Sequence, residues 1–184
     1  MFGGKTTALL AWVERKRYAC LDAVLIVWAD DNRYTDDGVA KTCTHSLQVA
    51  TPEKRTATKG GLRIVRAKSL AGLDIDEGVV AVDEGQFHPD ISVVCEAWAA
   101  AGKRVAVAAL DMRFDRSPFE NVALLMAIAD GSVVKFRPVC MRCRQRDAVY
   151  SCRTVADESP ILVGAADAYI ATCRGCWTPA PKKG

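Results

Sequence analysis

Residues 79–87 read VVAVDEGQF, a continuous apolar run that ends in two adjacent carboxylic acids. Similar unbroken runs occur at residues 23–28, AVLIVW, and 104–110, RVAVAAL. Strands in which apolar and polar residues alternate have one solvent-exposed face. Strands with an unbroken apolar run are buried on both faces, as in a parallel sheet. The three runs therefore predict a parallel sheet at the centre of an α/β domain.

Helical patterns separate these runs. One covers residues 5–19 and ends in a basic last turn, and a second begins near Pro89 and ends before Gly102. The second carries apolar residues at helical spacing, among them Cys95, which we expect to be a small core residue. Strands that alternate with helices predict right-handed crossovers, with helices on both faces of the sheet.

The sequence beyond the third run predicts one more helix and one more strand. Ser117 and Glu120 have the spacing of a capping box, so we expect a helix that begins at Ser117 and stops at Gly131. A short strand is expected at residues 132–136. The polar stretch 35–69 lacks periodicity and is expected to be irregular, with a hairpin as one option.

Four of the eight cysteines form two C-x-x-C pairs, Cys140 with Cys143 and Cys173 with Cys176. In a chain without an export signal, two such pairs indicate a closed tetrahedral zinc site with a structural role. A redox pair and a chance arrangement are the alternatives. Zinc would hold together the two ends of the long chain segment that lies between the pairs.

The composition fits one globular domain with a small appendage. The 184 residues carry 25 basic and 22 acidic side chains, a net charge of +3, which argues against nucleic acid or an anionic membrane as the main partner. No apolar run could span a bilayer and no charged-then-apolar leader opens the chain, so we expect a cytoplasmic protein.

The two histidines, His45 and His88, have no partners at ligand spacing and are expected to be bystanders. The expected division of the chain is a main domain at 1–138, a zinc-bearing subdomain at 139–177 and a flexible tail at 178–184.

The first chemical motif is Gly3-Gly4-Lys5-Thr6, which leads directly into the first helix. In a P-loop, backbone N–H groups and a helix N-terminus cradle phosphates, the lysine reaches the β- and γ-phosphates, and the hydroxyl binds Mg²⁺. Gly4 fills the second glycine position of that signature, and the first would lie before Met1. A chance G-G-K-T sequence is the alternative.

The second motif is the acidic pair Asp83-Glu84 at the end of the 79–82 run. An apolar strand that ends in an aspartate is the Walker-B pattern, in which the carboxylate helps to hold Mg²⁺. Neighbouring side chains at a strand end point to opposite faces, so Glu84 can take a proton from the hydroxyl of a second substrate. An ordinary acidic turn is the alternative.

Other strand ends carry an arginine and two aromatic residues. Arg33 follows the 23–28 run, where ligands bind in open α/β sheets and where a guanidinium could stabilise a transferring phosphoryl group. Phe87 and Phe114 also follow strands, where a flat base could pack against them. A solvated loop and ordinary core packing are the alternatives.

Taken together, these residues resemble the zinc-containing thymidine kinases of cytosolic, bacterial and poxviral type. The resemblance covers nearly the whole chain, and its landmarks are MFGGKTT, DDNRYT, CTH, AVDEGQF, ALDMRFDRSPF, VCMRC, VGAADAY and CRGC. It implies a RecA-like P-loop domain, a small zinc subdomain and a lasso loop that folds over the nucleoside. It also implies ATP and Mg²⁺ as cofactors with structural Zn²⁺, thymidine as substrate, and a homotetramer.

The resemblance implies roles for single residues. Lys5 and Thr6 match the phosphate-binding lysine and the Mg²⁺-binding hydroxyl, Asp83 the Walker-B aspartate, and Glu84 the base that deprotonates the 5′-hydroxyl. Further matches are Gln86 and Phe87 beside the acidic pair, Asp31 and Arg33 near the phosphates, Phe114 in the thymidine pocket, Leu162, Val163 and Gly164 in the lasso, Tyr169 on the sugar, and the four paired cysteines on zinc.

The expected activity is transfer of the γ-phosphoryl group of ATP to the 5′-hydroxyl of thymidine. The chain departs from the family pattern in four places, and one is Thr44-His45-Ser46, where the family usually has THD. The family's loop opens two residues before this chain, so its first glycine and preceding strand are expected to be absent. The family's usual turn glycine is replaced at Met112, and Ala165 ends the lasso motif. An inactive relative that binds nucleoside, and a P-loop ATPase with a nucleic-acid-binding zinc knuckle, are the rival hypotheses.

Overall fold

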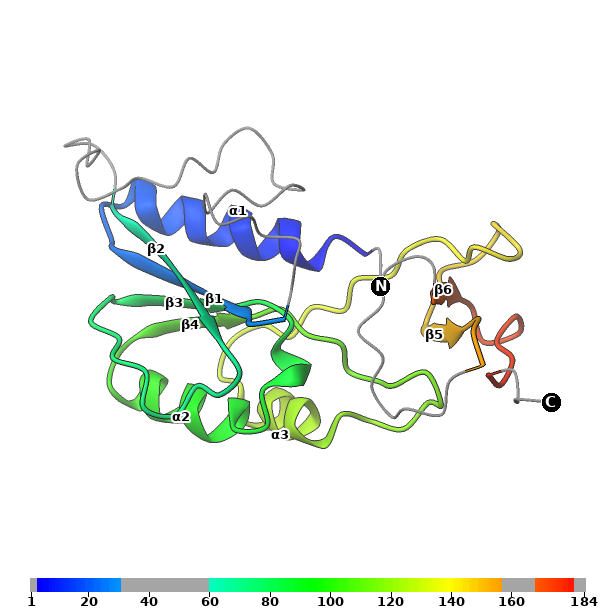
Figure 1. Ribbon diagram of the computed structural model, residues 1–184. Coiled ribbons are helices and arrows are strands. Elements are labelled where there is room, and N and C mark those ends of the chain that lie inside the picture. Colours follow the sequence, from blue (N-terminus) through cyan, green and yellow to red (C-terminus); the bar gives the residue numbers. More distant parts are fainter. Residues whose placement is uncertain (1–2, 31–59, 157–167, 181–184) are drawn as a thin grey trace.

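The computed structural model describes residues 3–30, 60–156 and 168–180 (Figure 1). Its centre is a sheet of four parallel strands in the order β2-β1-β3-β4. The strands are β1 (Ala23–Trp28), β2 (Leu62–Ala67), β3 (Val79–Val82) and β4 (Arg104–Val107). The predicted parallel sheet is confirmed, although its last strand ends at Val107 and not at residue 110.

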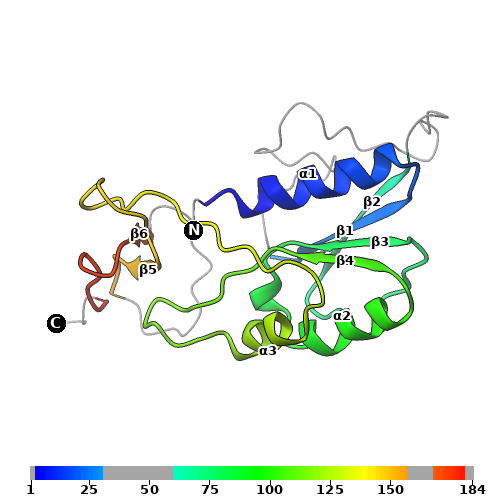
Figure 2. The same cartoon turned by 180° about the vertical axis from the view of Figure 1, so that it is seen from behind.

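Helices cover both faces of this sheet, as predicted (Figures 1 and 2). Helix α1 (Lys5–Tyr18) lies on one face, and α2 (Ile91–Ala100) and α3 (Glu120–Ile128) lie on the other. Because successive strand residues point to opposite faces, the sheet serves two cores. Residues of the α1 core include Leu9, Val13, Leu25 and Val27, and those of the α2 core include Ile26, Val82, Ile91, Cys95 and Trp98. Every residue of β3 is buried, which explains why the strand contains no polar residue.

The irregular stretch predicted at residues 35–69 is wrong over 62–67, where β2 forms the edge of the sheet. The sequence LRIVRA hides the strand because two arginines interrupt the apolar run. Because β2 is an edge strand, some of its side chains are exposed to solvent. One of them, Arg63, pairs with Glu77, with N···O distances of 2.6 and 2.8 Å. The rest of that stretch, up to residue 59, lies outside the described residues.

The predicted capping box at Ser117 is also wrong. Helix α3 begins at Glu120, and its N-cap residue, Phe119, makes no side-chain capping bond. The Ser117 hydroxyl instead donates to Asp115 at 2.6 Å, which closes a local turn. The helix ends at Ile128, shortly before the predicted stop.

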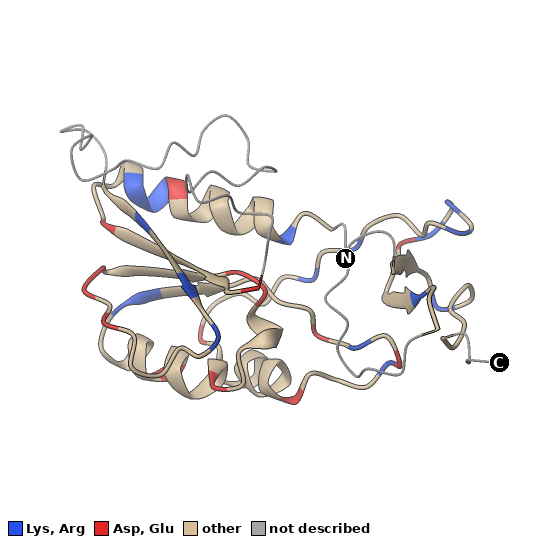
Figure 3. Cartoon of the chain, viewed as in Figure 1, with Lys and Arg blue, Asp and Glu red and all other residues tan. Residues whose placement is uncertain are grey.

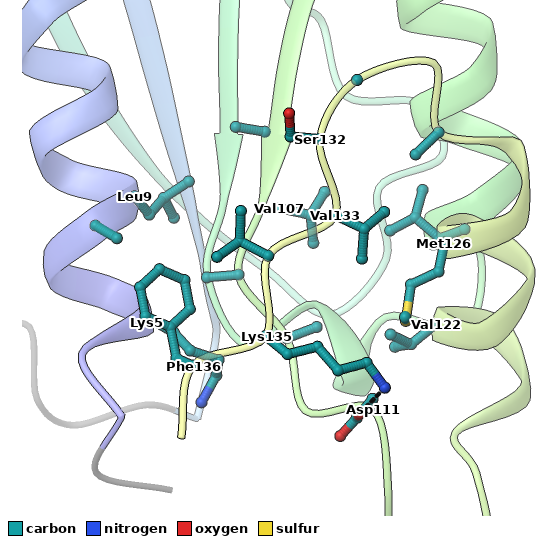
Figure 4. Close-up of a pocket in the computed structure, with 18 of the residues that line it drawn as sticks. Lys5, Leu9, Val107, Asp111, Val122, Met126, Ser132, Val133, Lys135 and Phe136 are labelled. Atoms are coloured by element: carbon teal, nitrogen blue, oxygen red, sulfur yellow. Dashed lines mark hydrogen bonds and ion pairs between the residues drawn. The ribbon is translucent and has the colours of Figure 1, made fainter. Parts of the chain in front are cut away.

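Residues 132–136 do not form the predicted strand. A cavity of about 1200 Å³ separates them from the free edge of β4 (Figure 4). Lys5, Leu9 and Phe136 line one side of this groove, and Val122 and Met126 on α3 line the other. A strand needs a partner for its backbone groups, and across this groove none of the described segments is close enough to pair.

Beyond residue 138 the chain forms a small second sheet. Strands β5 (Tyr150–Arg153) and β6 (Tyr169–Thr172) are antiparallel, and Arg153 lies directly opposite Tyr169. Among the described residues, charged positions of both signs occur in the main domain and in this region (Figure 3). Among the described residues, no helix combines the length and apolar character that a bilayer crossing requires.

Candidate active site and metal centre

The glycines before α1 form a turn that suits a phosphate. Gly4 is the N-cap of α1 with φ 76° and ψ 19°, a left-handed conformation in which a side chain would be strained. A Cβ on Gly3 would lie 3.0 Å from Cβ of Phe136. The first N–H groups of a helix have no partner within the helix and carry partial positive charge, so the first turn, with Lys5 and Thr6, can receive an anion.

The two motifs of the sequence meet at the end of the sheet. The Thr6 hydroxyl is 3.1 and 3.0 Å from the two carboxylate oxygens of Asp83, across 77 residues of sequence. Asp83 is 1 % exposed and follows β3 directly, and its backbone N–H donates to Ile26 O at 2.9 Å. The strand order places β1 beside both β2 and β3, and the crevice outside such a reversal is where open α/β sheets bind ligands.

Thr6 and Asp83 also fit a Mg²⁺ ion. Mg²⁺ prefers hard oxygen ligands and takes only one or two from the protein, with phosphates and water completing the shell. One hydroxyl and one buried carboxylate lie together beside the helix terminus that would hold the phosphates. These residues can therefore hold the ion where it would bridge protein and nucleotide.

Glu84 lies in a strained turn. Its φ of 52° and ψ of 41° are left-handed, which is uncommon for a residue with a side chain. Gln86 holds both ends of the turn, because its amide nitrogen donates to Glu84 Oε2 at 2.5 Å and its amide oxygen accepts from Leu110 N at 2.9 Å. A Cβ on Gly85 would lie 2.5 Å from Val107 Cγ1, so glycine lets the turn pack tightly on β4. Gln86 thus holds the Glu84 carboxylate in place, one residue along the chain from Asp83.

The predicted aromatic residues occupy two different places. Phe87 packs on Trp28 at the end of β1, with ring centres 5.5 Å apart. Phe114 lies in the loop after β4, where its backbone carbonyl accepts a hydrogen bond from Trp177 Nε1 at 3.1 Å. Tyr169 is 8 % exposed on β6.

Arg153 brings Phe114 and Tyr169 together. Its guanidinium carbon is 3.7 Å from the ring centre of Phe114, and Nη2 donates to Tyr169 Oη at 2.7 Å. Sequence reasoning missed Arg153 and also missed Trp28 and Trp177. In the sequence, Arg153 is a charged residue at the end of a short strand. Many solvent-exposed residues have the same context, so the sequence does not single it out.

The four paired cysteines converge, as predicted. Their Sγ atoms all lie within 4.8 Å of one another, and those of Cys143 and Cys173 are 3.9 Å apart. Tetrahedral zinc with bonds of about 2.3 Å would place sulfur atoms about 3.8 Å apart. Backbone hydrogen bonds set the turns that carry them, from Cys140 N to Arg146 O at 2.8 Å and from Cys176 N to Cys173 O at 3.1 Å. The geometry therefore fits a closed four-thiolate metal site.

His88, which the sequence predicted to be a bystander of the chemistry, lies in the interior of the protein. Its side chain is completely buried, with its ring edge-on to Trp28 at 5.2 Å. Neither ring nitrogen has a hydrogen-bond partner among the described residues. Burial lowers the pKa of His88, while the charge of Asp90 acts in the opposite direction. His88 is therefore a neutral packing residue beneath the active-site turn.

Some predicted site residues cannot be placed. Asp31 and Arg33, and the lasso residues Leu162, Val163 and Gly164, lie outside the described residues.

The parallel sheet, the phosphate-binding turn and the threonine–aspartate contact define a P-loop nucleotide-binding protein with an added four-cysteine metal centre. A model of the family described as thymidine kinase matches residues 1–177. The chain is 38 % identical to the cytosolic thymidine kinase of Homo sapiens over 177 residues, which cover 96 % of this chain and 69 % of the relative.

Other relatives agree. Identity is 40 % to the cytosolic thymidine kinase of Gallus gallus over 96 % of this chain and 73 % of the relative. It is 36 % to a thymidine kinase of Variola virus over 96 % of this chain and 92 % of the relative. The chain belongs to the thymidine kinase family.

Proposed function

We propose that the protein transfers the γ-phosphoryl group of ATP to the 5′-hydroxyl of thymidine. The observation that carries the proposal is the contact between Thr6 and Asp83, with Glu84 next to it in a strained turn. The contact joins a phosphate-binding helix terminus to the carboxylate that would help to hold Mg²⁺, and the next residue, Glu84, supplies a carboxylate that can act as a base. Membership of a family whose relatives are named thymidine kinases supplies the substrate.

The residues divide the work of phosphoryl transfer. The turn at Gly3 and Gly4 and the first N–H groups of α1 bind the phosphates, and Lys5 adds a positive charge. Thr6 and Asp83 would hold Mg²⁺, which neutralises the charge that develops on the phosphates. Glu84 accepts the proton of the 5′-hydroxyl as that oxygen attacks the γ-phosphorus. Positioning and charge neutralisation supply most of the catalysis in such reactions.

We assign the remaining residues by the family pattern. Asp31 and Arg33 act near the phosphates, Gln86 holds the base, Phe87 and Phe114 pack around the nucleoside, Tyr169 contacts the sugar, and Leu162, Val163 and Gly164 close over the base. The zinc subdomain at 139–177 contributes Tyr169 and the lasso residues, and the 1–138 domain contributes Phe87, Phe114 and the phosphate site. We further propose a homotetramer that acts in the cytoplasm without nucleic acid.

A transfer assay with γ-radiolabelled ATP tests the function. We expect label to appear in thymidine monophosphate, with a rate that depends on thymidine concentration. Calorimetric titration with ATP and thymidine provides the second arm. Binding of thymidine without label transfer would identify an inactive relative, and ATP hydrolysis that DNA stimulates and thymidine does not would identify the ATPase; either outcome contradicts the proposal.

A further inference from the structure

Arg153 carries a buried charge that the proposed mechanism does not use. The residue ends β5 and is 1 % exposed, although an arginine side chain usually keeps its charged head in water. Its guanidinium carbon lies 3.7 Å from the centre of the Phe114 ring and 5.3 Å from that of Tyr169. Burial of this charge is costly, and these contacts contribute to offsetting the lost hydration.

The hydrogen bond to Tyr169 has a direction fixed by chemistry. A guanidinium has only donors and stays protonated, so Nη2 donates and the phenol oxygen accepts, at 2.7 Å. The phenol's own hydrogen must then be donated in another direction. Arg153 therefore holds Tyr169 as a hydrogen-bond donor, which is the polarity needed to bind an oxygen of a sugar.

The fold brings the side chain of Arg153 into contact with residues from two different segments of the chain. Arg153 and Tyr169 are direct cross-strand partners on β5 and β6, so their side chains share one face. Phe114 comes from the loop after β4 in the main domain, and its ring stacks on the same guanidinium. The cation thus fixes the Phe114 ring and the Tyr169 hydroxyl relative to each other.

We propose that Arg153 is a positioning residue for the nucleoside, which sets the Phe114 ring against the base and the Tyr169 hydroxyl toward the sugar. The proposal rests on the proposed function for the identity of the nucleoside. Other arginines also lie over aromatic rings, and Arg174 is 5.2 Å from the ring centre of Tyr150. Arg174 is exposed and its aromatic partner is neither Phe114 nor Tyr169, so it provides a matched control.

The test compares Arg153→Lys and Arg153→Met with Arg174→Met in steady-state kinetics. We expect KM for thymidine to rise about tenfold or more in both Arg153 variants. Methionine lacks the charge and the hydrogen-bond donors, and lysine keeps the charge but lacks the planar guanidinium group. KM for ATP should stay within about twofold, since the phosphate site lies on other elements. Arg174→Met should retain both values. Tyr169→Phe should add little to Arg153→Met, because the phenol is held as a donor only while Arg153 is present.

Three results would overturn this role. They are an unchanged KM for thymidine in the Arg153 variants, equal losses for thymidine and ATP, or additive effects of Arg153→Met and Tyr169→Phe. If Arg153→Met fails to fold by circular dichroism, Arg153→Lys carries the same test. If the wild-type protein phosphorylates no thymidine, the proposed function is contradicted, and the role of Arg153 is tested by binding instead. Calorimetry then compares the thymidine affinity of the same variants with that of the wild type. A selective loss of thymidine affinity supports the role of Arg153, and unchanged affinity overturns it.

Discussion

Glu84 has a backbone conformation that few residues other than glycine adopt, with φ 52°. Such strain costs on the order of 1–3 kcal/mol and persists only where the surroundings impose it. The surroundings here are the side chain of Gln86 and the close packing of Gly85 on Val107. Since Glu84 directly follows Asp83 and is the base of the proposed reaction, the strained turn fits the proposed function.

Replacement of that carboxylate tests its role as the base. Glu84→Gln keeps the shape of the side chain but removes its ability to accept a proton. We expect kcat to fall by at least about 10²–10⁴-fold, the usual contribution of a general base, while calorimetry shows nearly unchanged ATP affinity. Glu96→Gln, on the exposed side of α2, is the control. Near-normal turnover in Glu84→Gln would rule Glu84 out as the base.

His88 predicts a dependence of stability on pH. Burial lowers its pKa in the folded protein, so the unfolded chain binds a proton at a higher pH than the folded chain does. Stability is then fully present above the unfolded pKa, about 6.5, and is lost as pH falls below that value. We expect the free energy of unfolding, measured with urea, to decrease between pH 7 and pH 5.5.

The variant His88→Leu isolates this contribution. It removes the titrating group and keeps an apolar side chain at a buried position, so the slope of stability against pH should become shallower over the same interval. The interval stays above the ordinary pKa range of carboxylic acids, which limits their contribution. The same slope in wild type and His88→Leu would show that His88 is not the responsible group.

At the scale of elements, β4 is one of the two edge strands of the described sheet. The groove beside it runs between α1 and α3, and apolar residues around it are unusually exposed, including Phe136 at 41 % and Val134 at 64 %. A strand placed there in parallel with β4 would end near Gly3, because α1 begins at the same end of the sheet as Asp83. A short loop would then join it to α1, as in a strand–P-loop–helix unit.

We therefore predict that an apolar five-residue strand, fused ahead of residue 1, stabilises the protein. Each apolar side chain that it buries contributes about 1.5–3 kcal/mol before entropy is subtracted, so Tm should rise by several degrees. Binding of the dye ANS should decrease as the groove is covered. A fusion of equal length with a central proline is the control, because proline cannot complete the ladder. Equal Tm values for the two fusions would contradict the prediction.

At the scale of the whole molecule, the four-cysteine cluster shares one small subdomain with two residues of the proposed nucleoside site. Strands β5 and β6, which carry Arg153 and Tyr169, lie between the two cysteine pairs in the sequence. A structural zinc site contributes folding free energy directly, since its ligands are not assembled in the unfolded chain. Loss of the metal should therefore disorder this region and spare the phosphate site.

The variant Cys173→Ser tests that coupling. We expect less than one equivalent of zinc by atomic absorption and at least tenfold weaker thymidine binding, with ATP affinity nearly unchanged. Cys20→Ser removes an exposed cysteine that belongs to neither pair and should retain full zinc content. Full zinc content together with normal thymidine binding in Cys173→Ser would separate the metal centre from the pocket.

Sequence reasoning succeeded where the signal is local. Unbroken apolar runs predicted β1 and β3, and two cysteine pairs predicted the four thiols that converge in the structure. It failed where several structures share one local pattern. LRIVRA resembles a polar loop because an edge strand tolerates arginine, and the Ser117–Glu120 spacing resembles a cap although Ser117 closes a different turn.

The sequence alone determined the class of sheet, the family, and which residue types could bind phosphate and metal. These follow from periodicity and motif spacing, which depend on near neighbours. Only the tertiary structure decided that Thr6 meets Asp83, that His88 is buried, and that Arg153 joins Phe114 to Tyr169. Those contacts depend on strand order and on the packing of distant segments, and local spacing carries no information about either.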